Sequence, residues 1–283
     1  MQIESCAPLA VSDDEFQLFQ RIVYQWSGIF LSPVKRALLA ARLSRRIRQL
    51  GLRSFGEYYR VVSAAGPEER RILLDSICTN ETHFFREPAQ FDFLDRVIVP
   101  SLMAERRPRH LSVWSAACST GQEPFSIAMA LHHRLAPSGW TIDVLATDLS
   151  TRALEAGRKA EWPIESAAEI PSPYLHRYML KGRQSKEGIM RAGPVLRSLV
   201  RFGQVNLSDA SYPMATSFDL IFCRNVMIYF DAASKKHVFD RLLAHLVPGG
   251  YLFLGHAESG TGWNEQLVPV RPAICQYRPR SAA

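Results

Sequence analysis

The sequence predicts an α/β domain built on a parallel sheet, preceded by a smaller domain made only of helices. From residue 13 to about 87, helical patterns follow one another with no strand pattern between them. From Leu111 onward, short apolar runs alternate with amphipathic stretches, which is the rhythm of βαβ units. Residues 88–110 lie between these regions, and we expect them to form a linker helix that ends in a polar, basic break.

The helical domain is assigned to residues 1–87. Asp13 opens an amphipathic stretch that continues to Tyr24, and acidic residues are favourable at the start of a helix. A second helix is expected from Pro33 to Gly51, because proline suits the first turn of a helix and glycine its end.

The α/β domain is assigned to residues 111–283. Its buried strands are expected in the apolar runs at 111–118, 141–148, 217–225 and 248–255. The alternation fails between Ser172 and Val205, where we expect a small antiparallel β-subdomain, about 172–205, to be inserted. The expected fold class is therefore α/β with a small inserted subdomain.

Composition and charge limit the kind of protein. Of the 283 residues, 47% are hydrophobic and 22% charged, a globular composition. The start does not resemble a signal peptide, and no apolar run approaches about 18 residues, so we expect a cytoplasmic protein without membrane insertion. A net charge of +7 indicates an acidic partner. Neither a disulfide framework nor a metal site is expected from the cysteines, which are Cys6, Cys78, Cys118, Cys223 and Cys275.

Two carboxylates follow the first two expected strands, where ligands bind in open parallel sheets. Glu123 begins the helix that follows the first strand. The turn before it contains only one glycine, Gly121, of the GxGxxG pattern that binds dinucleotides. Asp148 could accept hydrogen bonds from both hydroxyls of a ribose. Alternatively, Glu123 interacts only with the helix dipole and Asp148 caps the next helix. Together they favour a nucleoside cofactor over a dinucleotide.

Polar residues also follow two later strands. Asn206 and Leu207 follow a strand that ends near Val205, and Arg224 and Asn225 end the apolar run that begins at Ser217, with Tyr229 shortly after. These side chains could read an adenine edge or line an acceptor pocket, although an asparagine after a strand is also a common turn residue. If the charge of Arg224 is buried, it needs a partner.

Five segments of the chain resemble one family. They are KRALLAARLSRRIRQLG at 35–51, TNETHFFRE at 79–87, VWSAACSTGQEPFSIAM at 113–129, FDLIFCRNVMIYF at 218–230 and PGGYLFLGHAES at 248–259. They closely resemble the chemotaxis receptor methyltransferases known as CheR. The resemblance implies a Rossmann-like domain that transfers a methyl group from S-adenosyl-L-methionine to glutamates of methyl-accepting chemotaxis receptors. The products would be glutamate methyl ester and S-adenosyl-L-homocysteine.

The resemblance also implies roles for individual residues. Asn80, Thr82 and Arg86 would fold over the cofactor, with Arg86 near the reacting centre. The rest of the cofactor pocket would comprise Glu123, Asp148, Asn206, Leu207, Arg224 and Asn225. Tyr229 would face the sulfonium and the incoming carboxylate. A glutamate, with an ordinary pKa of about 4.3, is already ionised at neutral pH and needs no general base. Arg86 and Tyr229 are therefore expected to orient the reactants.

Between Lys35 and Arg53 there are seven basic residues and no acidic one. On a helical wheel, Lys35, Arg42 and Arg46 lie beside the apolar stripe that contains Leu39, Leu43, Ile47 and Leu50, and Arg45 lies at their edge. This face could simply be solvated. For an enzyme whose substrate is an acidic receptor helix, it would be a docking surface.

Two other functions remain open. A nucleic-acid methyltransferase would suit the positive charge, but residues 224–227 read Arg-Asn-Val-Met and lack the Asn/Asp-Pro-Pro-aromatic motif of amino-methylating enzymes. A receptor-binding adaptor without catalysis is the other. The hairpin tip at 181–188 resembles the part of the family that clasps a C-terminal receptor tether, though it contains less glycine than we expect of tether-binding members. We expect a monomer.

Overall fold

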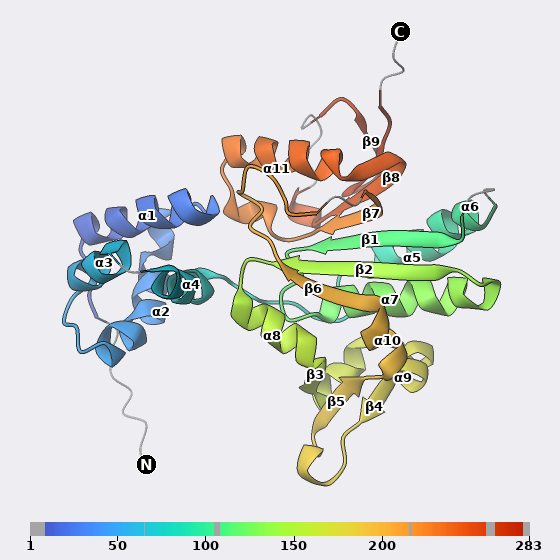
Figure 1. Ribbon diagram of the computed structural model, residues 1–283, viewed down its shortest axis with the longest axis horizontal. Coiled ribbons are helices and arrows are strands. Elements are labelled where there is room, and N and C mark those ends of the chain that lie inside the picture. The colour runs from blue at the N-terminus through green and yellow to red at the C-terminus, as the bar shows by residue number, and fades with distance from the viewer. Residues whose placement is uncertain (1–8, 65, 105–107, 215–216, 259–263, 280–283) are drawn as a thin grey trace.

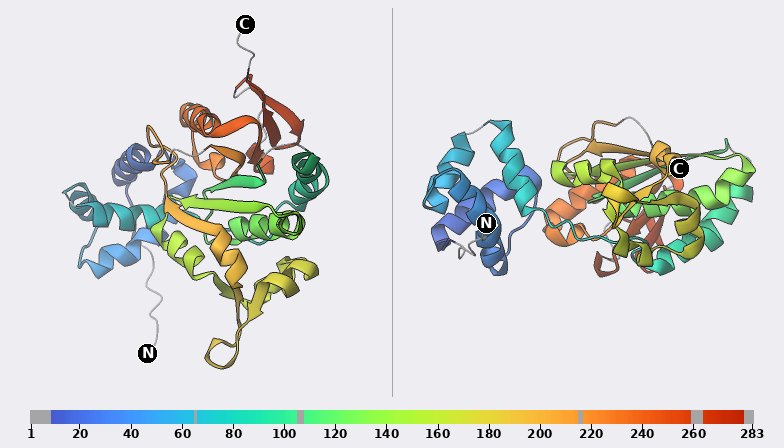
Figure 2. Two further views of the ribbon diagram at one scale, coloured as in Figure 1. Left: turned by 45° about the vertical axis from the view of Figure 1, so that its right-hand side comes forward. Right: turned by 90° about the horizontal axis from the view of Figure 1, so that it is seen from below.

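A helical unit and a larger α/β unit lie side by side along the long axis of the molecule (Figures 1 and 2). A computed structural model describes residues 9–64, 66–104, 108–214, 217–258 and 264–279. None of the helices in these ranges is long and apolar enough to cross a membrane.

The helical unit comprises α1 (Asp13–Ser27), η1 (Pro33–Lys35), α2 (Arg36–Gln49), α3 (Phe55–Ala64) and α4 (Pro67–Ile77). Ser12 and Glu15 form a capping box in which each side chain accepts a hydrogen bond from the other residue's backbone N–H. Gly28 ends α1 in the left-handed region, with φ 67°. The two helices expected in this region are confirmed.

The core of the helical unit is formed by the apolar faces of its helices. The ring of Phe19 stacks on that of Tyr58, with centroids 5.9 Å apart, and meets the edge of Phe55 at 6.0 Å. Leu39, Leu43 and Ile47 of α2 are also buried here, as their spacing predicts. Leu50, expected on the same stripe, is exposed because α2 ends at Gln49.

The linker lies at a different place from the one expected. The crossing segment, residues 78–87, contains neither helix nor strand and connects the two units. The helices that follow, α5 (Pro88–Phe93), the π-helical η2 (Leu94–Ile98) and α6 (Val99–Ala104), belong to the α/β unit. Their apolar side chains, Phe91, Leu94 and Ile98 among them, are buried in its main core. An amphipathic helix next to an uncovered sheet is stabilised by packing on it, so residues 88–104 do not act as a free linker.

The α/β unit is built on a seven-stranded sheet with the order β6-β2-β1-β7-β8-β10-β9. The strands are β1 (His110–Ala116), β2 (Thr141–Asp148), β6 (Val200–Gln204), β7 (Phe218–Cys223), β8 (Leu246–Leu254), β9 (Leu267–Arg271) and β10 (Ile274–Tyr277). The first five in this order pair in parallel, and β10 is antiparallel to both of its neighbours. The four strands expected from apolar runs are confirmed.

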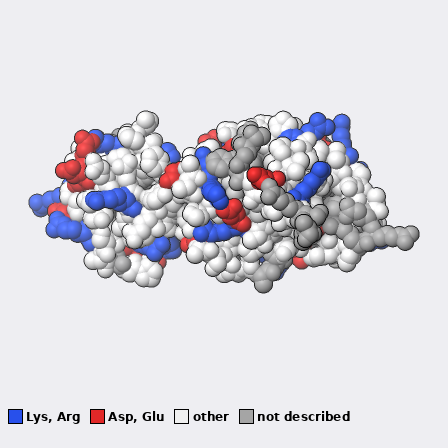
Figure 3. Space-filling model, turned by 90° about the horizontal axis from the view of Figure 1, so that it is seen from above, with Lys and Arg blue, Asp and Glu red and all other residues white. Residues whose placement is uncertain are grey.

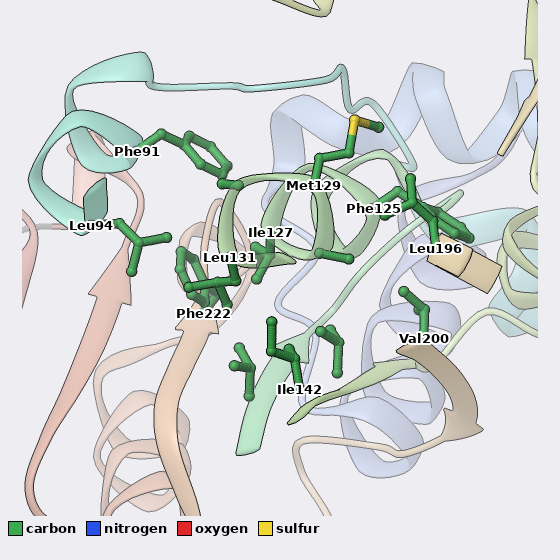
Figure 4. Packing of buried hydrophobic residues seen from close by; sticks show 14 of the residues in the cluster. Phe91, Leu94, Phe125, Ile127, Met129, Leu131, Ile142, Leu196, Val200 and Phe222 are labelled. Carbon is green, nitrogen blue, oxygen red and sulfur yellow. The ribbon is translucent and has the colours of Figure 1, made fainter. Parts of the chain in front are cut away.

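Helices cover both faces of this sheet. One face carries α7 (Gln122–Leu135), followed by η3 (Ala136–Ser138), and α8 (Thr151–Lys159), whereas α11 (Ala232–Ala244) covers the other (Figure 1). Ile127 and Leu131 of α7 pack toward Ile142 of β2 and Phe222 of β7 (Figure 4). Alternate residues of each strand therefore enter one core or the other, as in other doubly covered sheets.

The inserted subdomain is larger than expected. Its three-stranded antiparallel sheet has the order β3-β5-β4, from β3 (Glu161–Pro163), β4 (Met179–Lys181) and β5 (Ile189–Ala192). Its other elements are η4 (Ile164–Glu169), α9 (Ser172–Tyr178), η5 (Gln184–Lys186) and α10 (Pro194–Leu199). The insertion thus begins near residue 161 rather than 172, and residues 200–204 form β6 of the large sheet. The strand β3 is only three residues long and pairs with a strand far along the chain, so the local sequence contains no pattern that predicts it.

The cysteines within the described residues are Cys78, Cys118, Cys223 and Cys275, and all are free thiols. Burial raises the pKa of each thiol, to about 12 for Cys78 and well above its ordinary value for Cys118 and Cys223. They remain protonated and unreactive at neutral pH. Cys6, also considered above, lies outside the described residues.

A buried polar network in the helical unit gives the first prediction. Glu69 accepts hydrogen bonds from the Tyr58 hydroxyl, at 2.9 Å, and from the Arg46 guanidinium. Replacing Glu69 with alanine should lower the free energy of unfolding by about 2 kcal/mol, because buried donors lose their acceptor. The hydrogen-bonded Arg46 lowers the pKa of Glu69, so this stabilisation is present at neutral pH and is lost as the pH falls through the lowered value.

Urea unfolding of Glu69→Ala and wild type at pH 7 and at several pH values down to pH 2.5 would measure both effects. Glu68→Ala is the matched control, because Glu68 is the next residue and its ion pair with Arg71 is exposed to solvent. An equal loss in the two variants would contradict the assigned role of the network.

Candidate functional site

A cavity lies between the helical unit and the carboxyl ends of the central strands. Its walls come from α2 and the residues before it, the crossing segment, and the turns that follow β1, β2, β6 and β7. Most of the predicted site residues line it, namely Lys35, Arg42, Asn80, Thr82, Arg86, Glu123, Asp148, Asn206, Leu207, Arg224, Asn225 and Tyr229. Arg45 and Arg46 lie outside it.

The sheet topology explains the position of this cavity. The strand β1 lies between β2 and β7, and the chain runs from β1 to β2 before it later returns on the other side as β7. The connections after β1 and β7 lead to helices on opposite faces, which opens a crevice at the strand ends. The turn after β1 curves sharply there, with positive φ at Ala117, Ser119 and Gly121. A Cβ at Gly121 would lie 3.1 Å from Gly157 of α8, so the turn and α8 pack closely only around glycine.

Asp148, at the end of β2, is a fixed and buried acceptor. Its two carboxylate oxygens accept hydrogen bonds from the backbone N–H groups of Ser119 and Ser150, each at 2.8 Å. The helix cap suggested as an alternative is instead Ser150, whose hydroxyl accepts from Ala153 N–H. Burial raises the pKa of Asp148, although these backbone donors oppose the rise. Each oxygen retains a lone pair that can accept from a ligand hydroxyl.

Glu123, in the first turn of α7, is held by more than the helix dipole. Its carboxylate accepts a hydrogen bond of 2.6 Å from the Ser115 hydroxyl and one of 3.3 Å from Arg224. Burial raises its pKa, while the charge of Arg224 and the bond from Ser115 oppose the rise. A cationic ligand group next to Glu123 would favour the ionised carboxylate.

Arg224, after β7, is the most buried charge of the site, with 1% of its side chain exposed. Its guanidinium lies 3.4 Å from Glu87 and 3.3 Å from Glu123, and it donates to the Arg86 carbonyl. The Cζ atom of the guanidinium lies 5.9 Å from the centroid of the Phe91 ring. Among the described residues, its fully buried Nε–H has no acceptor. Arg224 therefore binds the crossing segment to the ends of β7 and α7.

Asn225 and Tyr229 are positioned by a residue that the sequence did not reveal. Glu258, in η7 (His256–Glu258), accepts hydrogen bonds from the N–H groups of Asn225 at 2.8 Å and Ile228 at 3.3 Å. Asn225 has φ 56°, a left-handed conformation that such anchoring maintains. Tyr229 ends the short helix η6 (Met227–Tyr229). Nothing in the local pattern around Glu258 indicates this contact with a turn some 30 residues earlier.

A second residue that the sequence did not reveal is Asp75 of α4. Its carboxylate accepts from the hydroxyls of Ser150 and Thr151, both at 2.7 Å, and from Arg71 at 3.2 Å. In the sequence, Arg71 and Asp75 are four residues apart, which is the spacing of an ordinary ion pair on a helix surface. In the structure, Asp75 instead attaches the helical unit to the start of α8, directly after Asp148.

The other predicted cavity residues have local contacts. Asn206 donates to the carbonyl of Trp26 at 2.8 Å and to Asp209 at 3.0 Å, so it is both a turn residue and a link to α1. The Asn80 carbonyl accepts from the Ser119 hydroxyl at 3.0 Å, which holds the crossing segment over the turn after β1. Arg86 donates to the Glu81 carbonyl at 3.3 Å. These contacts form the side of the cavity that faces the helical unit.

The basic face of α2 is not a uniform docking surface. The guanidinium of Arg42 donates to the carbonyls of Ile77 and Cys78, and Arg46 is paired with Glu69. The ammonium of Lys35 lies 4.8 Å from the ring centroid of Tyr229. Burial and the nearby Arg42 lower its pKa. Arg45 is exposed. Arg42 thus contacts the crossing segment and Arg46 contacts α4, while both side chains are only half-buried. Their role in receptor docking stays a prediction.

Two family profiles match this chain. Residues 14–78 match the CheR methyltransferase all-alpha domain, and residues 80–271 match the CheR methyltransferase SAM-binding domain. The matches therefore include both structural units and the crossing segment.

Several curated chemotaxis protein methyltransferases are similar to this chain over most of their length. Chemotaxis protein methyltransferase 2 of Pseudomonas aeruginosa is 38% identical over 246 residues, which cover 87% of this chain and 86% of that protein. The chemotaxis protein methyltransferase of Escherichia coli is 39% identical over 254 residues, covering 89% and 86%. That of Borreliella burgdorferi is 34% identical over 272 residues, covering 93% and 94%. With similarity of this extent across both units, the chain belongs to the CheR methyltransferase family.

Proposed function

We propose that this protein transfers the methyl group of S-adenosyl-L-methionine to glutamate side chains of chemotaxis receptors. The products are glutamate methyl esters and S-adenosyl-L-homocysteine. The observation that supports this most directly is the cavity itself, where a fixed carboxylate, Asp148, lies in the same space as Arg86, Arg224 and Tyr229. The relatives named chemotaxis protein methyltransferases supply the class of substrate.

The residues present fit S-adenosyl-L-methionine. Asp148 offers two buried carboxylate oxygens to the ribose hydroxyls, and Glu123 offers a carboxylate to the amino group of the methionine part. Arg86, which lines the cavity, can donate to its carboxylate. When bound, S-adenosyl-L-methionine supplies an electrophilic methyl group on a positively charged sulfur.

The protein then has to position the reactants rather than move a proton. A substrate glutamate is ionised at neutral pH, so no general base is needed. Arg86 and Tyr229 orient the incoming carboxylate, and the walls of the cavity exclude water from a reaction that neutralises two charges. His83, a residue that could be mistaken for a base, hydrogen-bonds through Nδ1 to the Phe84 carbonyl.

Receptor docking is assigned to the basic residues Lys35, Arg42, Arg45 and Arg46, of which Arg45 is exposed on α2. A C-terminal receptor tether on the inserted subdomain stays a prediction, in which β4 at the edge of the small sheet would accept an added strand. We also propose that the protein acts as a monomer in the cytoplasm. The face shown in Figure 3 carries Lys and Arg interspersed with Asp and Glu, unlike the broad basic stripe of a nucleic-acid-binding surface.

The glutamate assignment predicts a base-labile product. Incubation with labelled cofactor and receptor-containing membranes should place label on the receptor, and mild base should release that label as methanol. Methylated lysine, arginine or nucleobases would keep the label under the same treatment. Base-stable label would therefore overturn the ester assignment while leaving the family membership intact.

The role of Asp148 predicts a loss of cofactor affinity in the absence of any receptor. Calorimetry on Asp148→Asn should show S-adenosyl-L-homocysteine binding weakened about 10-fold to 100-fold, since a hydrogen bond to a charged acceptor contributes about 1.5–3 kcal/mol. Asp143→Asn is the matched control, because Asp143 lies on the same strand and its side chain is 46% exposed. Unchanged affinity in Asp148→Asn would remove this carboxylate from the cofactor site.

Cofactor binding should also depend on pH. Burial raises the pKa of Asp148 and of Glu123, whereas the cofactor's hydroxyl and amino groups favour the ionised carboxylates. Affinity should therefore be greatest above these raised pKa values and should weaken as the pH falls through them. Calorimetry from pH 8 down to pH 4 would measure this, and Asp148→Asn should show a shallower dependence. A flat profile in the wild type would contradict the proposed contacts.

A further inference from the structure

Four large apolar side chains are exposed on segments that border the cavity. They are Phe30 (50% exposed), Val34 (91%), Leu38 (40%) and Ile228 (52%), and we refer to them as the apolar rim. Leu38 itself lines the cavity, and the other three each neighbour a lining residue in the sequence. Exposed apolar side chains that gather at a functional site commonly mark a binding surface, whereas single ones need no explanation.

The rim is assembled from both units of the molecule. The N–H of Phe30 donates to the Tyr229 carbonyl at 2.8 Å, and Ile29 forms an isolated antiparallel bridge with Phe230. Phe30, from the helical unit, is therefore adjacent to the backbone that carries Ile228 and Tyr229 in the α/β unit. The exposed apolar residues Phe30 and Ile228 are thus both adjacent to the backbone of Tyr229.

A positive charge lies close to these apolar side chains. Lys35 directly follows Val34, and its ammonium lies 4.8 Å from the ring centroid of Tyr229. Arg42, a basic residue of α2 that also lines the cavity, is engaged with the carbonyls of residues 77 and 78. The opening therefore combines a cation next to Tyr229 with an apolar border, which fits a carboxylate whose neighbouring side chains are apolar.

We propose that the apolar rim binds the apolar side chains located one helical turn before and after the methylated glutamate of a receptor helix. Lys35 attracts the glutamate carboxylate toward Tyr229. On a helix, residues three and four positions away in both directions share the face of a given side chain, so they would meet a border that surrounds the opening. An amphipathic helix docking on apolar anchors in this way would also shield the reacting carboxylate from water. This inference rests on the proposed function.

The test uses the full chain and measures receptor methylation at varied receptor concentration. Phe30→Ser and Ile228→Ser should each lower kcat/KM about tenfold, mainly through KM, because each loses part of its apolar contact with the substrate. The dissociation constant for S-adenosyl-L-homocysteine should stay unchanged, which also shows that the variants fold. Val97→Ser is the matched control, since Val97 is 43% exposed in η2, next to α5 and α6 at the far end of the α/β unit (Figure 1).

A second measurement addresses the substrate directly. Helical peptides with one glutamate would carry either alanine or serine at the positions three and four residues away on both sides. Wild type should prefer the alanine peptide, and the preference should shrink in Phe30→Ser and Ile228→Ser, as expected for coupled partners.

Three outcomes would overturn the inference. Unchanged kcat/KM in both rim variants would do so, as would equal use of the two peptides by the wild type. If the wild type gives no base-labile methylation of receptor membranes, the proposed function fails and this inference fails with it. The first two outcomes, with active wild type, leave the proposed function standing.

Discussion

The burial of the Arg224 guanidinium is the constraint on which the rest of the site depends. A charge removed from water is tolerated only when it is paired and hydrogen-bonded. Glu123 supplies one partner from α7, but the other two, Glu87 and the Arg86 carbonyl, belong to the crossing segment. The segment must therefore fold back across the end of β7. In doing so it carries Asn80, Thr82 and Arg86 into the cavity and becomes one of its walls.

Further attachments hold the helical unit in place. Asp75 binds the hydroxyls at the start of α8, and Phe30 pairs with the backbone at Tyr229. The first attachment adjoins Asp148 and the second adjoins the opening of the cavity. The helical unit thus contributes walls of the site itself, and a disturbance of its docking would reach both the cofactor pocket and the acceptor side. A separate recognition module would affect only the acceptor.

The arrangement suits a reaction that requires orientation of the reactants and exclusion of water rather than acid-base catalysis. Its buried ionisable groups, Glu123, Asp148 and Arg224, are each matched by hydrogen bonds within the fold. At the opening, polarity falls, and a cation next to Tyr229 is bordered by apolar side chains. Such a gradient from a polar interior to an apolar rim permits a charged acceptor to enter while its flanking residues remain on the surface.

The sequence by itself determined the helices of the N-terminal unit, the central strands, and the polar residues at the strand ends. Each of these is a local pattern: a cap, an apolar run, or a side chain directly after a strand. Only the tertiary structure decided which elements pack against each face of these helices and strands. The wheel of α2 placed Arg42 and Arg46 correctly beside the apolar stripe, but it could not show that they contact the crossing segment and α4. The roles of Asp75 and Glu258, the packing of residues 88–104 on the sheet, and the start of the insertion at β3 were likewise hidden. In each case the contacting residue is distant in the chain. The periodicity of apolar residues predicts that one face of an element is buried, but it does not predict which other element packs on that face.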